Sequence, residues 1–212
     1  MAKAVLFDLD GTLVDTLTDI SAAMNRALRM HGLPEWDREE YKYLVGDGAK
    51  TLAVRAVRDR QEMAETVRAE YQKWYEKHDI EESAAYQGMP ETLAALAAKG
   101  IRLCVLSNKP DADTVRVVKH FYPDVPFEII RGQVPGVPVK PDPTGAIAMA
   151  GEMGLAPAEF LYLGDTKVDM TCARNAGMTP IGALWGFRTA EELTENGAER
   201  LLKEPKELIE II

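Results

Sequence analysis

Short apolar runs alternate with amphipathic helical patterns along most of this chain. The apolar runs predict strands at residues 4–9, 101–107, 127–130, 160–164 and 179–184. Between them, apolar residues recur at helical spacing, which predicts helices near residues 90–99, 111–120, 144–153, 168–176 and 189–196. Strands and helices that alternate in this way indicate parallel strands joined by crossover helices. The expected fold class is therefore α/β, with a doubly wound parallel sheet as its core.

Residues 16–84 interrupt the alternation, because they contain helical patterns and no strand-like run. Asp37 and Glu40 have the spacing of a capping box, which predicts the start of a helix that runs to residue 45. Further helices are expected across residues 51–58 and 61–77. The sequence thus predicts an all-helical domain inserted after the first strand. The insertion comprises residues 16–84, and the doubly wound core comprises residues 1–15 and 85–212.

Composition and charge narrow the class of partner. The 212 residues include 25 Lys or Arg and 34 Asp or Glu, so the formal net charge is −9. Such an acidic chain is a poor match for nucleic acid or for an anionic membrane surface, and neither is expected as a partner. The sequence shows no signal-peptide pattern and no apolar stretch long enough to span a membrane. With Cys104 and Cys172 expected to be buried free thiols, the sequence predicts a cytoplasmic protein and sets no oligomeric state.

Three carboxylates crowd the end of the first predicted strand. In the stretch VLFDLDGTLVDT, a buried run leads directly into Asp8, Asp10 and Asp15. Like charges this close repel one another, and burial disfavours the ionised form of each carboxyl group. A bound cation is the expected compensation. Asp15 is expected to be structural and to help start the next helix together with Thr16.

Polar side chains also follow the other predicted strands. Ser107 ends the second strand, Lys140 lies on a loop after the third, and Asp165 follows the run at 160–164. Because ligands bind beyond the carboxyl ends of parallel strands, these side chains are expected to meet at one edge of the sheet. Asp8, Asp10 and Asp165 then offer the oxygen ligands that Mg²⁺ prefers. The sequence therefore predicts a magnesium site at this edge.

This set of side chains suits phosphoryl transfer. Asp8 is placed to attack phosphorus as a nucleophile and to form an aspartyl phosphate. Asp10, two residues on, is placed to protonate the leaving oxygen and then to activate water. Ser107 and Thr12 can donate hydrogen bonds to phosphoryl oxygens. Lys140 can neutralise charge that grows on those oxygens in the transition state.

Four ordered motifs, DLDGTLVDT, LSNK, KPDP and GDTKVD, resemble those of the haloacid dehalogenase superfamily, and the resemblance spans nearly the whole chain. The stretches LVGDGAKTL, YQGMPETLAALAAKG and ALWGF are similar to the phosphoglycolate phosphatases of that superfamily. The resemblance implies that Asp8 is nucleophile and metal ligand, and that Asp10 is general acid/base with its backbone carbonyl on the metal. It implies further that Asp165 is the third protein ligand. By the same resemblance, residues 16–84 would form a mobile helical cap that closes over a Rossmann-like catalytic core of residues 1–15 and 85–212. Residues Ser107, Asn108, Lys140 and Thr12 are expected to surround the phosphate.

Several residues keep two interpretations. Asp169 is expected just outside the metal ligands, where it either holds a water molecule or caps a helix. The cap tripeptide Gly46, Asp47 and Gly48 either contacts substrate or forms a turn between helices. Arg55 either binds a substrate carboxylate or faces solvent. Lys109 is expected to shape its loop rather than take part in the chemistry.

The expected function is a Mg²⁺-dependent phosphatase that hydrolyses a small phosphorylated metabolite, with phosphoglycolate as the first substrate by resemblance. Within the same fold, a pyrophosphatase and a phosphosugar mutase compete with it. A carbon–halogen hydrolase is a weaker alternative, because halide leaves without protonation and Asp10 would have little to do. From a different class, a non-catalytic phosphate-binding module is the remaining alternative.

Overall fold

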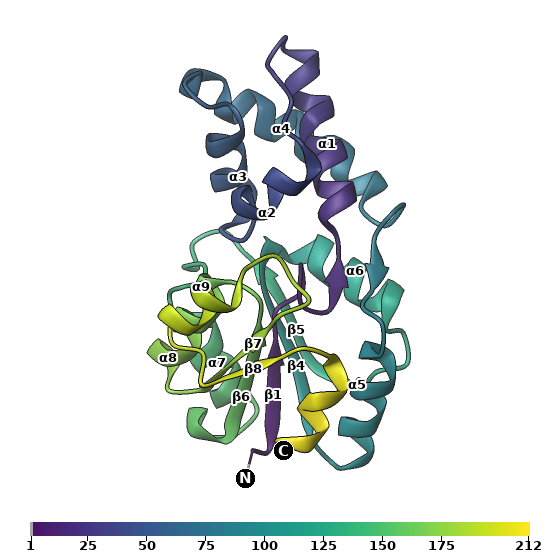
Figure 1. Ribbon diagram of the computed structural model, residues 1–212, viewed down its shortest axis with the longest axis vertical. Helices are drawn as coiled ribbons and strands as arrows, with labels where there is room; N and C mark the ends of the chain where they lie inside the picture. Colours follow the sequence, from purple (N-terminus) through teal and green to yellow (C-terminus); the bar gives the residue numbers. More distant parts are fainter. Residues whose placement is uncertain (1) are drawn as a thin grey trace.

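A computed structural model describes residues 2–212 and confirms the α/β fold class. The strands of the main sheet run parallel in the order β5-β4-β1-β6-β7-β8 (Figure 1). These strands are β1 (Ala4–Phe7), β4 (Arg102–Pro110), β5 (Phe127–Gln133), β6 (Phe160–Gly164), β7 (Thr179–Ala183) and β8 (Arg200–Leu202). Because β1 pairs with β4 on one side and β6 on the other, the strand order reverses there. The loop after β1 therefore opens at the point where such sheets bind ligands.

Helices cover both faces of this sheet, because successive residues of a strand point to opposite sides. The helices of the sheet region are α5 (Met89–Ala98), α6 (Asp111–Phe121), α7 (Thr144–Glu152), α8 (Lys167–Ala176) and α9 (Ala190–Glu195). On one face, Val5 and Phe7 of β1 share an apolar core with α5 and α6. On the other face, Ala4 and Leu6 share a core with α7 and α8. Cys104 and Cys172 are buried free thiols, as expected.

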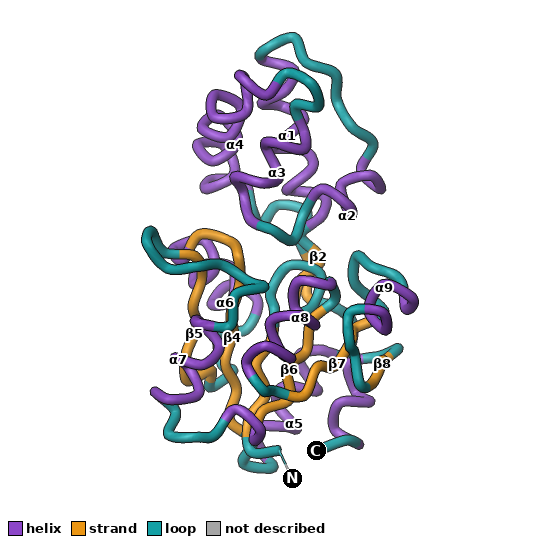
Figure 2. The backbone as a smooth tube through the Cα atoms, turned by 90° about the vertical axis from the view of Figure 1, so that its left-hand side faces the viewer, coloured by secondary structure: helices purple, strands orange, loops and turns teal. Residues whose placement is uncertain are grey.

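The predicted helical insertion is confirmed. It stands over the carboxyl ends of the strands and contains α1 (Leu17–Met30), α2 (Tyr41–Leu44), α3 (Gly48–Ala56) and α4 (Ala64–His78) (Figures 1 and 2). It encloses an apolar core of its own, to which Leu28, Tyr41 and Tyr75 belong. The chain enters it through β2 (Val14–Asp15) and leaves it through β3 (Ala84–Ala85), which pair antiparallel. The division into a cap at 16–84 and a core on either side stays a prediction.

Some local details differ from the predicted pattern. The segment after Asp37 begins as a 3₁₀ helix, η1 (Arg38–Glu40), before it becomes α2. The capping interaction itself is present, since the Glu40 carboxylate accepts a hydrogen bond from the Asp37 N–H at 3.0 Å. Other 3₁₀ helices are η2 (Gln61–Met63), η3 (Pro157–Glu159) and η4 (Pro205–Glu210). Among residues 2–212, no helix is both long enough and apolar enough to cross a membrane.

Candidate active site

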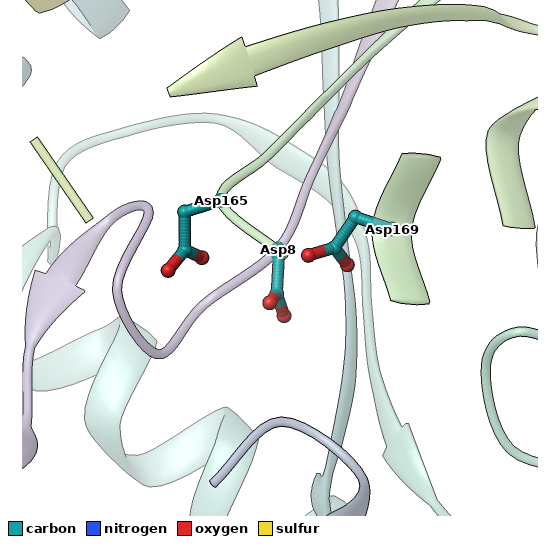
Figure 3. A group of neighbouring side chains, drawn as sticks. All are labelled: Asp8, Asp165 and Asp169. Atoms are coloured by element: carbon teal, nitrogen blue, oxygen red, sulfur yellow. The ribbon is translucent and has the colours of Figure 1, made fainter. Parts of the chain in front are cut away.

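Two strand ends bring the first two carboxylates of the site together. Asp8 follows β1 and Asp165 follows β6, and these strands are paired with Phe7 opposite Leu163. Asp169 lies in the first turn of α8, which starts two residues after Asp165. One oxygen of each of the three side chains lies within 4.8 Å of the others, and all three residues are buried (Figure 3). Two of the three predicted metal ligands, Asp8 and Asp165, thus lie close together, and Asp169 is the third member of the group.

Close packing fixes Asp165. The Thr12 hydroxyl donates a hydrogen bond to it at 2.8 Å, and the Phe187 N–H donates another at 2.8 Å. A Cβ atom on Gly11 or Gly186 would lie 2.3 or 2.2 Å from Asp165 atoms, so neither position has room for a side chain. Thr12, expected at the phosphate, therefore holds a carboxylate of the site in this structure.

Asp169 is fixed in a similar way by the start of α8. The Thr166 hydroxyl and backbone N–H donate to one carboxylate oxygen at 2.7 and 3.1 Å, which gives the helix a capping box. A Cβ on Gly164 would lie 2.3 Å from the Asp169 Cβ, so only glycine fits there. Asp169 therefore caps α8, which is one of its two predicted interpretations. Its second carboxylate oxygen contacts Lys140 in the site.

Lys140 is the cation of this cluster. Its Nζ lies 2.7 Å from both Asp8 and Asp169, and the side chain is buried. Asn108 fixes the Lys140 backbone, because its side chain accepts from the Lys140 N–H at 2.9 Å and donates to the Lys140 carbonyl at 3.0 Å. Asn108 also donates to the Gly46 carbonyl at 3.0 Å, and so connects the strand end to the helical insertion.

One lysine does not balance three buried carboxylates. Burial raises the pKa of Asp8 well above its usual range, and the neighbouring Asp169 charge adds to the rise. Burial and Asp169 also raise the pKa of Asp165 to about 7. Carboxylate oxygens at this spacing are ligands for a hard divalent cation, whose charge would compensate them. The buried group of Asp8, Asp165 and Asp169 could therefore bind a metal.

The Asp10 carboxylate lies outside this group. It accepts a hydrogen bond from the Thr16 hydroxyl at 2.7 Å and pairs with Lys109 Nζ at 2.6 Å. Lys109 Nζ also donates to the Tyr75 hydroxyl of α4 at 2.9 Å. Burial disfavours the Lys109 charge, but Asp10, Tyr71 and Asp79 together outweigh burial and raise the pKa of the ammonium. Sequence reasoning missed this role of Lys109, and only its place two residues after Ser107 pointed toward the site.

A cavity of about 50 Å³ lies between the sheet and the helical insertion. From the core, its lining includes Asp8, Asp10, Ser107, Asn108 and Lys109. From the insertion, it includes Ile20, Val45, Gly46, Gly48, Ala49, Leu52, Tyr71, Gln72 and Tyr75. Two predicted cap contacts, Gly46 and Gly48, thus line the cavity.

Asp47 and Arg55, the other two predicted cap contacts, pair with each other at 2.6 Å instead of lining this cavity. The Arg55 guanidinium also donates to the Leu44 carbonyl at 2.9 Å. In this structure the pair therefore supports the loop at the start of α3. Any contact between these two side chains and a substrate stays a prediction.

Comparison with known proteins shows the family of this chain. The family model of haloacid dehalogenase-like hydrolases matches residues 5–183, so the chain belongs to that family of hydrolases. A phosphoglycolate phosphatase from Aquifex aeolicus is 29% identical, covering 99% of this chain and 96% of the relative. An N-acetylmuramic acid 6-phosphate phosphatase from Pseudomonas aeruginosa is 32% identical, covering 99% and 94%. A predicted phosphoglycolate phosphatase from Haemophilus somnus has a TM-score of 0.92 at 27% identity, covering 99% of this chain and 97% of that one.

Proposed function

We propose that this hydrolase is a Mg²⁺-dependent phosphatase that forms an aspartyl phosphate on Asp8. The observation that carries the proposal is the position of the Asp8 carboxylate. It lines the cavity, contacts Lys140 at 2.7 Å and shares a buried cluster with two further carboxylates. A nucleophile surrounded in this way can meet a dianionic phosphate only if local cations lower the repulsion.

The donor set fits Mg²⁺ better than a softer metal, because the three clustered side chains offer carboxylate oxygens. Asp8 and Asp165 would hold the ion through their side chains, and Asp10 through its backbone carbonyl. Asp169 would stand beside these ligands, tied to Lys140. When bound, Mg²⁺ would neutralise charge on the carboxylates and on the phosphate.

The reaction then has two steps. An Asp8 oxygen attacks phosphorus, the phosphorus–ester oxygen bond breaks, and Asp10 gives its proton to the departing alkoxide. Water next attacks the phosphorus of the aspartyl phosphate while Asp10 takes its proton, and the bond to Asp8 breaks to release phosphate. Ser107 and Asn108 line the cavity, and the Ser107 hydroxyl can donate to a phosphoryl oxygen. The Asn108 amide donates to the Gly46 and Lys140 carbonyls and so supports the site beside the phosphate, and Lys140 supplies positive charge beside Asp8.

Phosphoglycolate is the substrate that we propose first. A small cavity suits a small phosphomonoester, and the relatives from Aquifex aeolicus and Haemophilus somnus carry that substrate in their names. The relative from Pseudomonas aeruginosa supports a second candidate, N-acetylmuramic acid 6-phosphate. We also propose that residues 16–84 act as a cap over the bound substrate.

Phosphate release from a substrate panel tests this function. The panel contains phosphoglycolate, N-acetylmuramic acid 6-phosphate, a phosphosugar and pyrophosphate, each with MgCl₂ and with chelator. The expected result is Mg²⁺-dependent release that is fastest with phosphoglycolate. Preference for pyrophosphate would indicate a pyrophosphatase, and transfer between sugar hydroxyls without free phosphate would indicate a mutase. Release from none of them would contradict the phosphatase and leave the mutase, the carbon–halogen hydrolase and the binding module.

The raised pKa of Asp165 predicts how pH and Mg²⁺ affect stability. The usual pKa is 3.8 and the folded value is about 7, so between these values the folded state holds a proton that the unfolded chain has released. Without metal, stability should therefore fall as pH rises from about 4 to 7. At pH 8, Mg²⁺ should raise Tm by about 5 °C or more, and at pH 5 by less, because protons compete for the ligands.

Thermal melting in chelator and in MgCl₂ at the two pH values provides the measurement. CaCl₂ at the same ionic strength separates selective Mg²⁺ binding from binding of any divalent cation, and NaCl controls for screening. A larger Mg²⁺ effect at pH 5 than at pH 8 would contradict the assignment of the metal to these carboxylates.

A further inference from the structure

Lys109 has surroundings that its place in a loop motif did not predict. It belongs to β4, and its side chain is 4% exposed. Its Nζ lies 2.6 Å from an Asp10 oxygen and donates to the Tyr75 hydroxyl at 2.9 Å. It also lies 4.9 Å from the centre of the Tyr75 ring. Lys109 therefore joins the proposed acid/base residue to a helix of the insertion.

Lys109 is the one cationic side chain among the described residues that line the cavity. Other cations nearby have different partners. Lys140 lies between Asp8 and Asp169, and Arg188 donates to the Val45 carbonyl at 3.0 Å. Much of the insertion's contribution to the lining is apolar, as with Ile20, Val45 and Leu52. An anionic group on the leaving-group side of the cavity would thus find its cation in Lys109.

The ammonium group still has a donor to offer. It carries three N–H donors, and Asp10 and Tyr75 account for two of them. To take a proton from Asp10, the ester oxygen of a substrate must lie against the Asp10 carboxyl group. A carboxylate one carbon beyond that oxygen then lies within reach of Lys109 Nζ, which is 2.6 Å from Asp10.

We propose that Lys109 determines specificity by binding a carboxylate on the leaving group. This inference rests on the proposed phosphatase function and narrows its substrate class. The preferred substrates are phosphate esters of 2-hydroxycarboxylic acids, in which one carbon separates the ester oxygen from the carboxylate. Tyr75 is a positioning residue, because its hydroxyl holds Nζ toward the cavity from the side of the insertion.

Two matched substrates test the proposal. 2-Phosphoglycolate and 2-hydroxyethyl phosphate have the same phosphate group and the same chain length. The first ends in a carboxylate, and the second ends in a neutral hydroxymethyl group. The wild-type protein should favour 2-phosphoglycolate by about 10-fold or more in kcat/KM, as expected for a buried charge-assisted hydrogen bond. Lys109→Met should remove that preference, with the main loss on 2-phosphoglycolate. Equal kcat/KM values for the two substrates in the wild type would overturn the proposal.

The variants separate specificity from a general role. An equal loss on both substrates in Lys109→Met would show that Lys109 serves Asp10 alone, and would overturn the proposal. If Lys109→Met does not fold, Tyr75→Phe tests the proposal instead, because it removes only the hydroxyl group that accepts a hydrogen bond from Lys109 Nζ. Its preference for 2-phosphoglycolate should fall about threefold, and an unchanged preference would then count against Lys109. If the proposed phosphatase function itself is wrong, the result is different: neither substrate releases phosphate in a Mg²⁺-dependent way.

Discussion

Asp8→Asn is expected to lower phosphate release by about 10⁴-fold or more while the fold stays intact. An amide is a poor nucleophile toward phosphorus, and the proposed aspartyl phosphate cannot form on it. The same change removes one of three buried like charges, and burial and Asp169 already hold the pKa of Asp8 high. In chelator at pH 8, Tm should therefore stay constant or rise.

Phosphate release under saturating MgCl₂, together with thermal melting, provides the two readouts. Asp142→Asn is a matched control, because Asp142 is an exposed carboxylate whose side chain accepts a hydrogen bond from the Thr144 N–H. Normal turnover in Asp8→Asn would refute Asp8 as the nucleophile. A loss of activity accompanied by a large fall in Tm would attribute the effect to folding instead.

Asp10→Asn is expected to slow the release of alkyl alcohols by about 10²- to 10⁴-fold in kcat/KM. An alkoxide leaves only with a proton, which asparagine cannot supply. Nitrophenolate leaves without protonation, so kcat/KM for p-nitrophenyl phosphate should fall far less. This ratio reports on the first step alone, because kcat/KM covers events up to the departure of the leaving group. Loss of the base in the second step would appear in kcat for both substrates.

The asparagine keeps the shape of the side chain, and its amide oxygen can still accept from Thr16 and Lys109. The comparison therefore tests proton transfer more than position. Equal losses of kcat/KM for alkyl and nitrophenyl esters would count against Asp10 as the acid.

The core of the fold could be predicted because its signals are local. The run at 160–164 forms β6 at the predicted residues, and the other predicted strands are found with ends that differ by a few residues. Once the strands are parallel, the meeting of Asp8 with Asp165 follows from topology alone. β8 was not predicted, because three residues at a sheet edge carry too little apolar pattern.

The contacts of the site depend on tertiary packing and were only partly predictable. Asp169 approaches Asp8 because α8 starts immediately after β6, and the sequence could not show which of its two interpretations would hold. The contacts from Lys109 to Asp10 and to Tyr75 join residues 99 and 34 positions apart in the chain. No periodic pattern reports such a pair. The roles of the site residues in catalysis stay predictions until the variants are measured.

The helical insertion leaves and rejoins the rest of the chain on one small ladder, with Val14 opposite Ala85 and Asp15 opposite Ala84. Facing residues of such a ladder are only about 5 Å apart, a span that a hairpin turn can close. The positions of β1, which precedes Asp8, and of β4, which contains Ser107, therefore do not depend on how many residues lie between the two halves of the ladder. The ladder thus lets the insertion change in length or content as a module without displacing the strand ends below it.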